Sequence, residues 1–135
     1  MLEVCGSVNK GKNMYELMVS MKFSAAHYLK GYDGACRNVH GHNYKVEVFL
    51  EGNSLQETAM LVDFKQIKKY LADILERLDH QLLNEVLDFN PTAERMAEYI
   101  FGKLDKKLPV NCKLAKVAIW ENDDSRATFI PEKEV

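Results

Sequence analysis

Three of the four histidines in this 135-residue sequence lie close together in the chain, at His27, His40 and His42. Side chains two residues apart in a strand share a face, so His40 and His42 can converge on one point while His27 arrives from the end of the preceding strand. Three neutral imidazoles that leave a fourth position open to water or substrate are typical of catalytic zinc sites. The sequence therefore predicts Zn²⁺ on these three residues. The alternative is that they are three independent polar side chains.

Cys36 lies four residues before His40, in a polar segment from which it can reach the surroundings of the metal. As a fourth ligand, its thiolate would close the site and make the metal structural. As an unbound thiol beside the cation, it would serve as a base or nucleophile. The third alternative is an inert thiol, which is also the expectation for Cys5 and Cys112.

The fourth histidine, His80, follows Asp79 at the end of a predicted helix. A neighbouring carboxylate can orient an imidazole so that it relays a proton, which makes this pair a catalytic candidate. The structural alternative is a cationic imidazole that stabilises the C-terminal end of the helix dipole.

Glu121 shares strand parity with the apolar residues Val117 and Ile119, so its side chain is expected on the inward face at the end of a strand. A carboxylate there needs a partner. The amino-pyrimidinone edge of a pterin or guanine presents neighbouring N–H donors that would satisfy both carboxylate oxygens. The alternative is a carboxylate on the rim of the sheet, in contact with water.

Two strands are predicted to present these side chains. Apolar residues occupy alternate positions over residues 15–23 and again over residues 42–50, which is the period of a half-buried strand. The first strand is expected to end just before Ser24. Two further alternating runs, at residues 114–121 and 126–130, flank a turn-prone segment and are expected to form a hairpin.

Two helices are predicted between the two pairs of strands. Asp63 and Gln66 form a capping pattern for a helix over about residues 64–78. The second helix is expected to begin at Asn90 and Pro91, since proline is tolerated in a first turn. The order ββααββ predicts an α+β fold.

The composition limits the classes of ligand that the protein is expected to bind. Hydrophobic residues make up 47% of the chain and charged residues 28%, with a formal net charge of -2, which favours a small-molecule ligand over nucleic acid or a membrane surface. The chain lacks an apolar run of the roughly 20 residues needed to span a bilayer. We expect a flexible extension over residues 1–13, a single domain over residues 14–135, reduced thiols and a cytoplasmic location.

Several local patterns together resemble the 6-pyruvoyl-tetrahydropterin synthase superfamily over about residues 14–130. The patterns are FSAAH at 23–27, CRNVHGHNY at 36–44, VDF at 62–64, LDH at 78–80, NPTAE at 90–94 and WE at 120–121. The resemblance implies the tunnelling fold (T-fold), in which ββααββ subunits join their sheets into an oligomeric β-barrel, commonly as a homohexamer built from a dimer of trimers.

The resemblance also implies roles for individual residues. It places zinc on the three clustered histidines and makes Cys36 the general base. It assigns a second proton relay to Asp79 and His80, and the anchoring of the pterin to Glu121. Thr92 is implied as an additional pterin contact, with a structural role at the start of the second helix as the alternative.

The spacing within one pattern favours a particular branch of the superfamily. Three residues separate Cys36 from His40, similar to the bacterial and archaeal 6-carboxy-tetrahydropterin synthases of queuosine (7-deazapurine) biosynthesis. That branch implies conversion of 7,8-dihydroneopterin triphosphate to 6-carboxy-5,6,7,8-tetrahydropterin, acetaldehyde and triphosphate. The alternatives are 6-pyruvoyl-tetrahydropterin formation, side-chain cleavage for folate synthesis, and a noncatalytic binding module stabilised by zinc.

Overall fold

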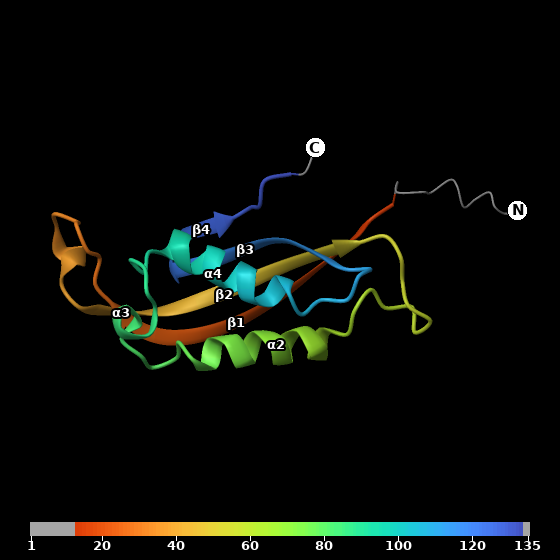
Figure 1. The fold of residues 1–135 in the computed structure, drawn as a ribbon, viewed down its shortest axis with the longest axis horizontal. Coiled ribbons are helices and arrows are strands. Elements are labelled where there is room, and N and C mark those ends of the chain that lie inside the picture. Colours follow the sequence, from red (N-terminus) through yellow and green to blue (C-terminus); the bar gives the residue numbers. More distant parts are fainter. Residues whose placement is uncertain (1–12, 134–135) are drawn as a thin grey trace, which may run out of the picture.

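A four-stranded antiparallel sheet in the order β1-β2-β3-β4 forms the centre of the computed structural model, which describes residues 13–133. Two long helices, α2 and α4, pack against the sheet and each other (Figure 1). In chain order the elements are β1 (Tyr15–His27), the 3-10 helix η1 (Ala35–Arg37), β2 (His40–Gly52), α2 (Phe64–Glu76), α3 (Leu83–Val86), α4 (Ala93–Asp105), β3 (Lys113–Asn122) and β4 (Ser125–Phe129). The predicted α+β class and the ββααββ order are confirmed, with η1 and α3 as additions. The extension expected over residues 1–13 lies, apart from Asn13, outside the described residues.

The sheet has one face that packs against the helices and one that does not. On β2, the fully buried side chains Tyr44, Val46 and Val48 alternate with the partly exposed Lys45 and Glu47. We call the side that carries Tyr44 and Val46 the core face and the side that carries Lys45 and Glu47 the outer face. Within the described residues, no helix is long and apolar enough to cross a membrane.

The prediction that the first strand ends before Ser24 is wrong, because β1 continues to His27. Its last four residues pair with β2 in unbroken register, from Ser24 opposite Asn43 to His27 opposite His40. Hydrogen bonding to β2 therefore outweighs the weak strand preference of the intervening alanines. As a result, His27 is a strand residue with a fixed direction and does not belong to the following loop.

Each long helix begins at a side-chain cap. At the start of α2, the Asp63 carboxylate accepts a hydrogen bond from the backbone N–H of Lys65 at 2.9 Å. At the start of α4, the Thr92 hydroxyl oxygen accepts one from the backbone N–H of Arg95 at 3.1 Å. The prediction that Pro91 lies in the first turn of the second helix is wrong, since Pro91 comes before this cap and α4 begins after it.

Two asparagines fasten the segment between α2 and α4 to the chain that leaves β1. The side-chain amide of Asn84 accepts from the backbone N–H of Tyr28 and donates to its carbonyl, both at 2.9 Å. Asn90 makes the same pair of hydrogen bonds with Lys30, at 2.9 and 3.0 Å. These bonds hold the segment beside the end of β1, where the clustered histidines lie.

Replacing Asn84 by alanine should therefore destabilise the fold. Asn84→Ala loses two part-buried hydrogen bonds to the backbone, which predicts a fall of about 2 kcal/mol in the free energy of unfolding. Urea denaturation measures it. The control is Asn53→Ala, at an exposed position after β2, which should change stability by less than about 0.5 kcal/mol. Equal effects of the two substitutions would contradict the proposed clamp.

Candidate metal centre

The three clustered histidines lie together on the core face at one end of β1 and β2. His27, the last residue of β1, is paired with His40, the first residue of β2, and His42 follows two residues later on the same face. Their candidate ligand atoms all lie within 4.8 Å of one another. His27 is fully buried, whereas the other two imidazoles are partly exposed. The pairing of two strands thus assembles a group that could hold a metal ion.

Backbone carbonyls fix the tautomers of two of these imidazoles. His27 Nδ1 lies 2.7 Å from the carbonyl oxygen of Pro91, and His40 Nδ1 lies 2.7 Å from that of Asn38. A carbonyl only accepts, so in both histidines Nδ1 carries the proton and Nε2 presents a lone pair. This is the arrangement of metal-ligating histidines, whose second nitrogen is held by an outer partner.

The remaining lone pairs have no hydrogen-bond donor as partner within residues 13–133. Nε2 of His27 and Nε2 of His40 are 3.2 Å apart, and with both tautomers fixed neither can donate to the other. Nε2 of His42 is buried and makes no hydrogen bond. Buried polar atoms are rarely left in this state without a ligand. The donor set and its orphaned atoms fit a metal ion bound by His27, His40 and His42.

Burial favours the neutral form of two histidines of the cluster, His27 and His42. Desolvation lowers the pKa of His27 below 6.5, an effect opposed in part by its hydrogen bond to Pro91 and reinforced by the other two histidines. Desolvation also lowers the pKa of His42, against the opposing influence of the Glu121 carboxylate. Near neutral pH both imidazoles are therefore uncharged, as a metal ligand must be.

Tyr44 contacts the histidine cluster on the core face, a role that the sequence analysis missed. Its hydroxyl oxygen lies 3.3 Å from His27 Nδ1, and its ring stacks on Phe23 with centroids 4.9 Å apart. Burial, followed by the charge of Glu121, raises the pKa of Tyr44 above its usual range, so the hydroxyl stays protonated. Its strand parity with His40 and His42 is the signal that could have identified it. The backbone carbonyls of Pro91 and Asn38, which hold His27 and His40, could not be identified from the residue types in the sequence.

Asp79 and His80 form the hydrogen-bonded pair that the sequence suggested, but not at a helix end. Oδ2 of Asp79 lies 3.0 Å from Nδ1 of His80, and its Oδ1 accepts from the backbone N–H of Ser24 at 3.0 Å. The hydrogen bond from Ser24, followed by that from His80, lowers the pKa of the Asp79 carboxyl. Helix α2 ends earlier, and His80 has φ 61 in the turn beyond it. Its imidazole is therefore oriented by Asp79 and exposed, away from the helix dipole.

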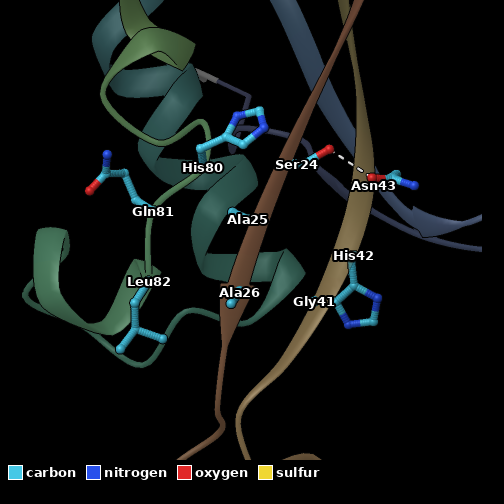
Figure 2. Close-up of a pocket in the computed structure, with 9 residues that line it drawn as sticks. All are labelled: Ser24, Ala25, Ala26, Gly41, His42, Asn43, His80, Gln81 and Leu82. Atoms are coloured by element: carbon cyan, nitrogen blue, oxygen red, sulfur yellow. Dashed lines mark hydrogen bonds between the residues drawn. The ribbon is translucent and has the colours of Figure 1, made fainter.

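A cavity of about 480 Å³ opens at the same end of the sheet, with lining residues from β1, β2 and the segment after α2 (Figure 2). His80 lines it from beside β1, and His42 is the one member of the histidine cluster that lines it. Ser24 and Asn43, joined by a 2.7 Å hydrogen bond between their side chains, lie between them. The volume is sufficient for a small heterocyclic ligand.

Glu121 lies near the end of β3, at an irregularity in its pairing with β4. Its carboxylate is partly exposed and makes no hydrogen bond or ion pair within the described residues. Its charge nevertheless opposes the desolvation that lowers the pKa of His27 and His42, and it adds to the burial that raises the pKa of Tyr44. The carboxylate is thus near the histidine cluster and has both oxygens available to a ligand.

Cys36 and Thr92 lie outside the group of ligand atoms. Cys36 belongs to η1, whose position is fixed by a 2.8 Å hydrogen bond from the backbone N–H of Leu29 to the Cys36 carbonyl. Its thiol is partly exposed and is not disulfide-bonded. Thr92 caps α4 through its hydroxyl, which is the structural alternative considered for it. Neither residue contributes an atom to the group of candidate metal ligands.

Comparison with known proteins gives the family. The sequence model described as 6-pyruvoyl tetrahydropterin synthase matches residues 16–132. The chain belongs to this family. It is 35% identical over 99 residues to a 6-carboxy-5,6,7,8-tetrahydropterin synthase of Synechocystis sp., with 69% of this chain and 77% of that protein covered. It is 34% identical over 102 residues to a dihydroneopterin monophosphate aldolase of Pyrococcus furiosus, with 76% and 85% covered.

The fold agrees with this assignment. The solved structure of 6-pyruvoyl tetrahydropterin synthase from Caenorhabditis elegans superposes with a TM-score of 0.78 at 29% identity, covering 89% of this chain and 97% of that one. The resemblance inferred from the six local patterns and the T-fold that it implied are confirmed. Members of the 6-pyruvoyl tetrahydropterin synthase family carry the names of different reactions, so the reaction of this chain is a separate question.

The lowered histidine pKa values predict how the metal-free protein responds to acid. Below pH 6.5 the unfolded chain binds protons at His27 and His42 that the folded chain does not, so stability should fall as the pH drops from 6.5 toward the lowered folded-state pKa values. Above pH 6.5 the two histidines are neutral in both states, and this loss of stability is absent. Urea unfolding after metal removal, at a series of pH values, measures the slope. His42→Asn should give a shallower slope, and a slope equal to that of wild type would refute the assignment.

Proposed function

We propose that this chain is a zinc-dependent 6-carboxy-5,6,7,8-tetrahydropterin synthase of the cytoplasm. It converts 7,8-dihydroneopterin triphosphate to 6-carboxytetrahydropterin, acetaldehyde and triphosphate, as an early step of queuosine biosynthesis. The observation that carries the proposal is the cluster of three imidazoles whose free Nε2 atoms face one another. The short spacing between Cys36 and His40, and the name carried by the Synechocystis relative, support this reaction over others in the family.

Zinc suits the three histidines by ligand type, and the spacing of two of them, His27 and His40, agrees with it. Tetrahedral zinc with Zn–N bonds of about 2.0–2.1 Å places two ligand nitrogens about 3.3 Å apart. The corresponding Nε2 atoms of His27 and His40 are 3.2 Å apart, which supports this metal. When bound, zinc supplies Lewis-acid polarisation of a substrate oxygen. The protein contributes the fixed tautomers, which keep the lone pairs of both residues directed toward the ion.

Glu121 is proposed to anchor the pterin ring. Its two carboxylate oxygens accept from the neighbouring N–H groups of the amino-pyrimidinone edge, a planar match that a single hydroxyl or amide does not provide. The lack of a protein partner for this carboxylate and its influence on the pKa of His42 support the role. The anchored ring then determines which side-chain carbon of the substrate meets the proton-transferring groups.

Proton transfer is proposed for Cys36 and for the Asp79–His80 pair. The hydrogen bond with Asp79 occupies Nδ1 of His80 and leaves Nε2 available to exchange a proton with a ligand. The exposed imidazole of His80 lines the cavity at this end of the sheet, so the pair is suited to act on a ligand bound there. Cys36, in the loop that connects β1 to β2, is proposed as the base that acts on the other side of the ligand from His80. Thr92, next to the carbonyl that holds His27, is proposed as a further pterin contact.

The proposal includes a homohexamer, built as a dimer of trimers, of chains whose single domain covers residues 14–135. The outer strands β1 and β4 each have one edge without a neighbour in the sheet of a single chain. Such edges expose unpaired backbone groups, which closure into a barrel would satisfy. This feature supports the oligomeric β-barrel that the family resemblance implies.

Side-chain cleavage is the second candidate. The relative from Pyrococcus furiosus named as a dihydroneopterin monophosphate aldolase is a specific observation in its favour. The same zinc, pterin anchor and proton-transferring groups would serve this reaction. It differs from the first candidate, and from 6-pyruvoyl-tetrahydropterin formation, in the fate of the substrate side chain.

Product analysis distinguishes these reactions. Zinc-loaded protein incubated with 7,8-dihydroneopterin triphosphate should give 6-carboxytetrahydropterin and acetaldehyde, identified by mass spectrometry. His42→Ala should lose most of its zinc and its turnover, because three ligands leave little redundancy. A 6-pyruvoyl or a 6-hydroxymethyl product would assign the chain to one of the other reactions. No product in the presence of bound zinc would remove the catalytic proposal.

The role of Cys36 separates an enzyme from a closed structural zinc site. If Cys36 is a base, Cys36→Ala should retain zinc and melting temperature and lose turnover by about 10²-fold or more. If it is a fourth ligand, the substitution should instead release zinc and lower the melting temperature, since metal binding then contributes to folding. Cys112→Ala, at a buried position in the core, is the control for loss of a thiol without loss of turnover. Retained zinc with unchanged turnover would show that Cys36 has neither role.

A further inference from the structure

The outer face of the sheet carries one row of residues that crosses all four strands. Lys22 of β1 is directly opposite Lys45 of β2, Lys45 is opposite Trp120 of β3, and Trp120 is opposite Arg126 of β4. Directly opposed residues share a face, and Lys45 lies on the outer face. We call these four residues the cationic row. It is separated from the histidine cluster by the sheet itself, since the histidines lie on the core face.

A network of contacts holds the middle of the row in place. The Lys45 ammonium and the Arg126 guanidinium each lie 5.2 Å from the centroid of the Trp120 ring, within the range of cation–π attraction. The Trp120 indole N–H donates to Oε1 of Glu47 at 3.0 Å. Glu47 also lies 3.8 Å from Lys45 and 3.7 Å from Arg126, and its side chain is only 12% exposed. The two cations are therefore fixed on either side of the indole.

The charges of the row do not balance. In the part of the chain that the structure describes, Glu47 is the one carboxylate that makes ion pairs with the row, against the three cations Lys22, Lys45 and Arg126. Within the described residues Lys22 makes no ion pair, and it lies directly opposite another lysine. Like charges in a directly opposed cross-strand pair are destabilising. Glu47 offsets part of this repulsion through Lys45, and a bound anion would relieve the remainder.

We propose that the cationic row binds a linear polyphosphate, with the chain of phosphates lying across the strands. Neighbouring strands are about 4.8 Å apart, so the cations of the row extend over roughly 14 Å. A single phosphate contacts at most two of them, whereas a chain of phosphates reaches from Lys22 past Trp120 to Arg126. Guanidinium and ammonium groups are the usual partners of phosphate oxygens. The inference does not depend on zinc or on the reaction proposed above.

A second group of cations provides a matched comparison. Arg77, Lys103 and Lys107 line a groove of about 260 Å³ between α2 and α4. Arg77 is the C-cap of α2 and Lys103 lies in the last turn of α4, where positive charge stabilises the helix dipole. The ammonium groups of Lys103 and Lys107 lie over tyrosine rings. Because the helix ends and the Asp73 carboxylate, which also lines the groove, offset part of this positive charge, we expect this groove to bind polyphosphate more weakly than the row.

The single tryptophan of the sequence makes the proposal directly measurable, because Trp120 lies within the row. Inorganic triphosphate, added to the zinc-containing full-length protein at constant ionic strength, should change the tryptophan emission in a saturable way. Lys22→Gln and Arg126→Gln should each raise the Kd about tenfold, since each loses one charge-assisted contact. Lys22→Arg should retain the affinity of the wild type. Lys103→Gln, in the groove between the helices, should also bind as the wild type does.

Two further measurements test whether the change in tryptophan emission arises from loss of metal or from binding at the metal site. The zinc content is determined after titration, since triphosphate chelates metals. His42→Ala, which is altered in the proposed metal site, should still bind triphosphate with the affinity of the wild type. Absence of a saturable change in the wild type would overturn the proposal. An affinity equal to that of the wild type in both Lys22→Gln and Arg126→Gln would also overturn it. Weakened binding in Lys103→Gln or His42→Ala alone would place the bound triphosphate in the groove between the helices or at the metal site.

Discussion

The antiparallel register between β1 and β2 is the constraint on which both faces of the sheet depend. It places His27 opposite His40 and, in the same ladder, Lys22 opposite Lys45. A slip of one residue would move every side chain of one strand to the other face. The buried stack of Phe23 on its direct partner Tyr44, next to the histidines, makes such a slip costly, because it would expose one of the two rings and break the stack.

The histidine cluster also depends on the helix layer, through a single backbone carbonyl. Pro91 accepts the hydrogen bond that fixes the tautomer of His27, and the next residue, Thr92, is the cap of α4. The packing of α4 on β3 and β4 therefore determines where this carbonyl lies. Outer partners of this kind orient a metal ligand and tune its basicity. The cap is thus as important for the site as for the helix, which gives the start of α4 two reasons to be well defined.

Much of this arrangement could be predicted from the sequence because strand periodicity is explicit in it. The alternation from His42 to Leu50 predicts one buried face, and the same parity predicts that His40 joins it. The end of β1 could not be predicted in this way, since the alanines before His27 have no side chain that distinguishes strand from loop. The carbonyl partners of the imidazoles were equally inaccessible, because a backbone contact between distant segments leaves no mark on residue type.

Adjacent residues of β2 serve two unlike environments. His42 and Tyr44 face a buried region in which desolvation keeps the imidazole of His42 neutral and the phenol protonated. Lys45 and Glu47 face the open side, where the Glu47 carboxylate and the Trp120 indole contact the Lys45 ammonium. The two sets have opposite electrostatic requirements: a metal ligand must lose its charge, whereas a phosphate-binding group must keep it. The strand satisfies both because successive side chains point to opposite faces, so the sheet separates neutral ligands from charged ones over a distance of one residue.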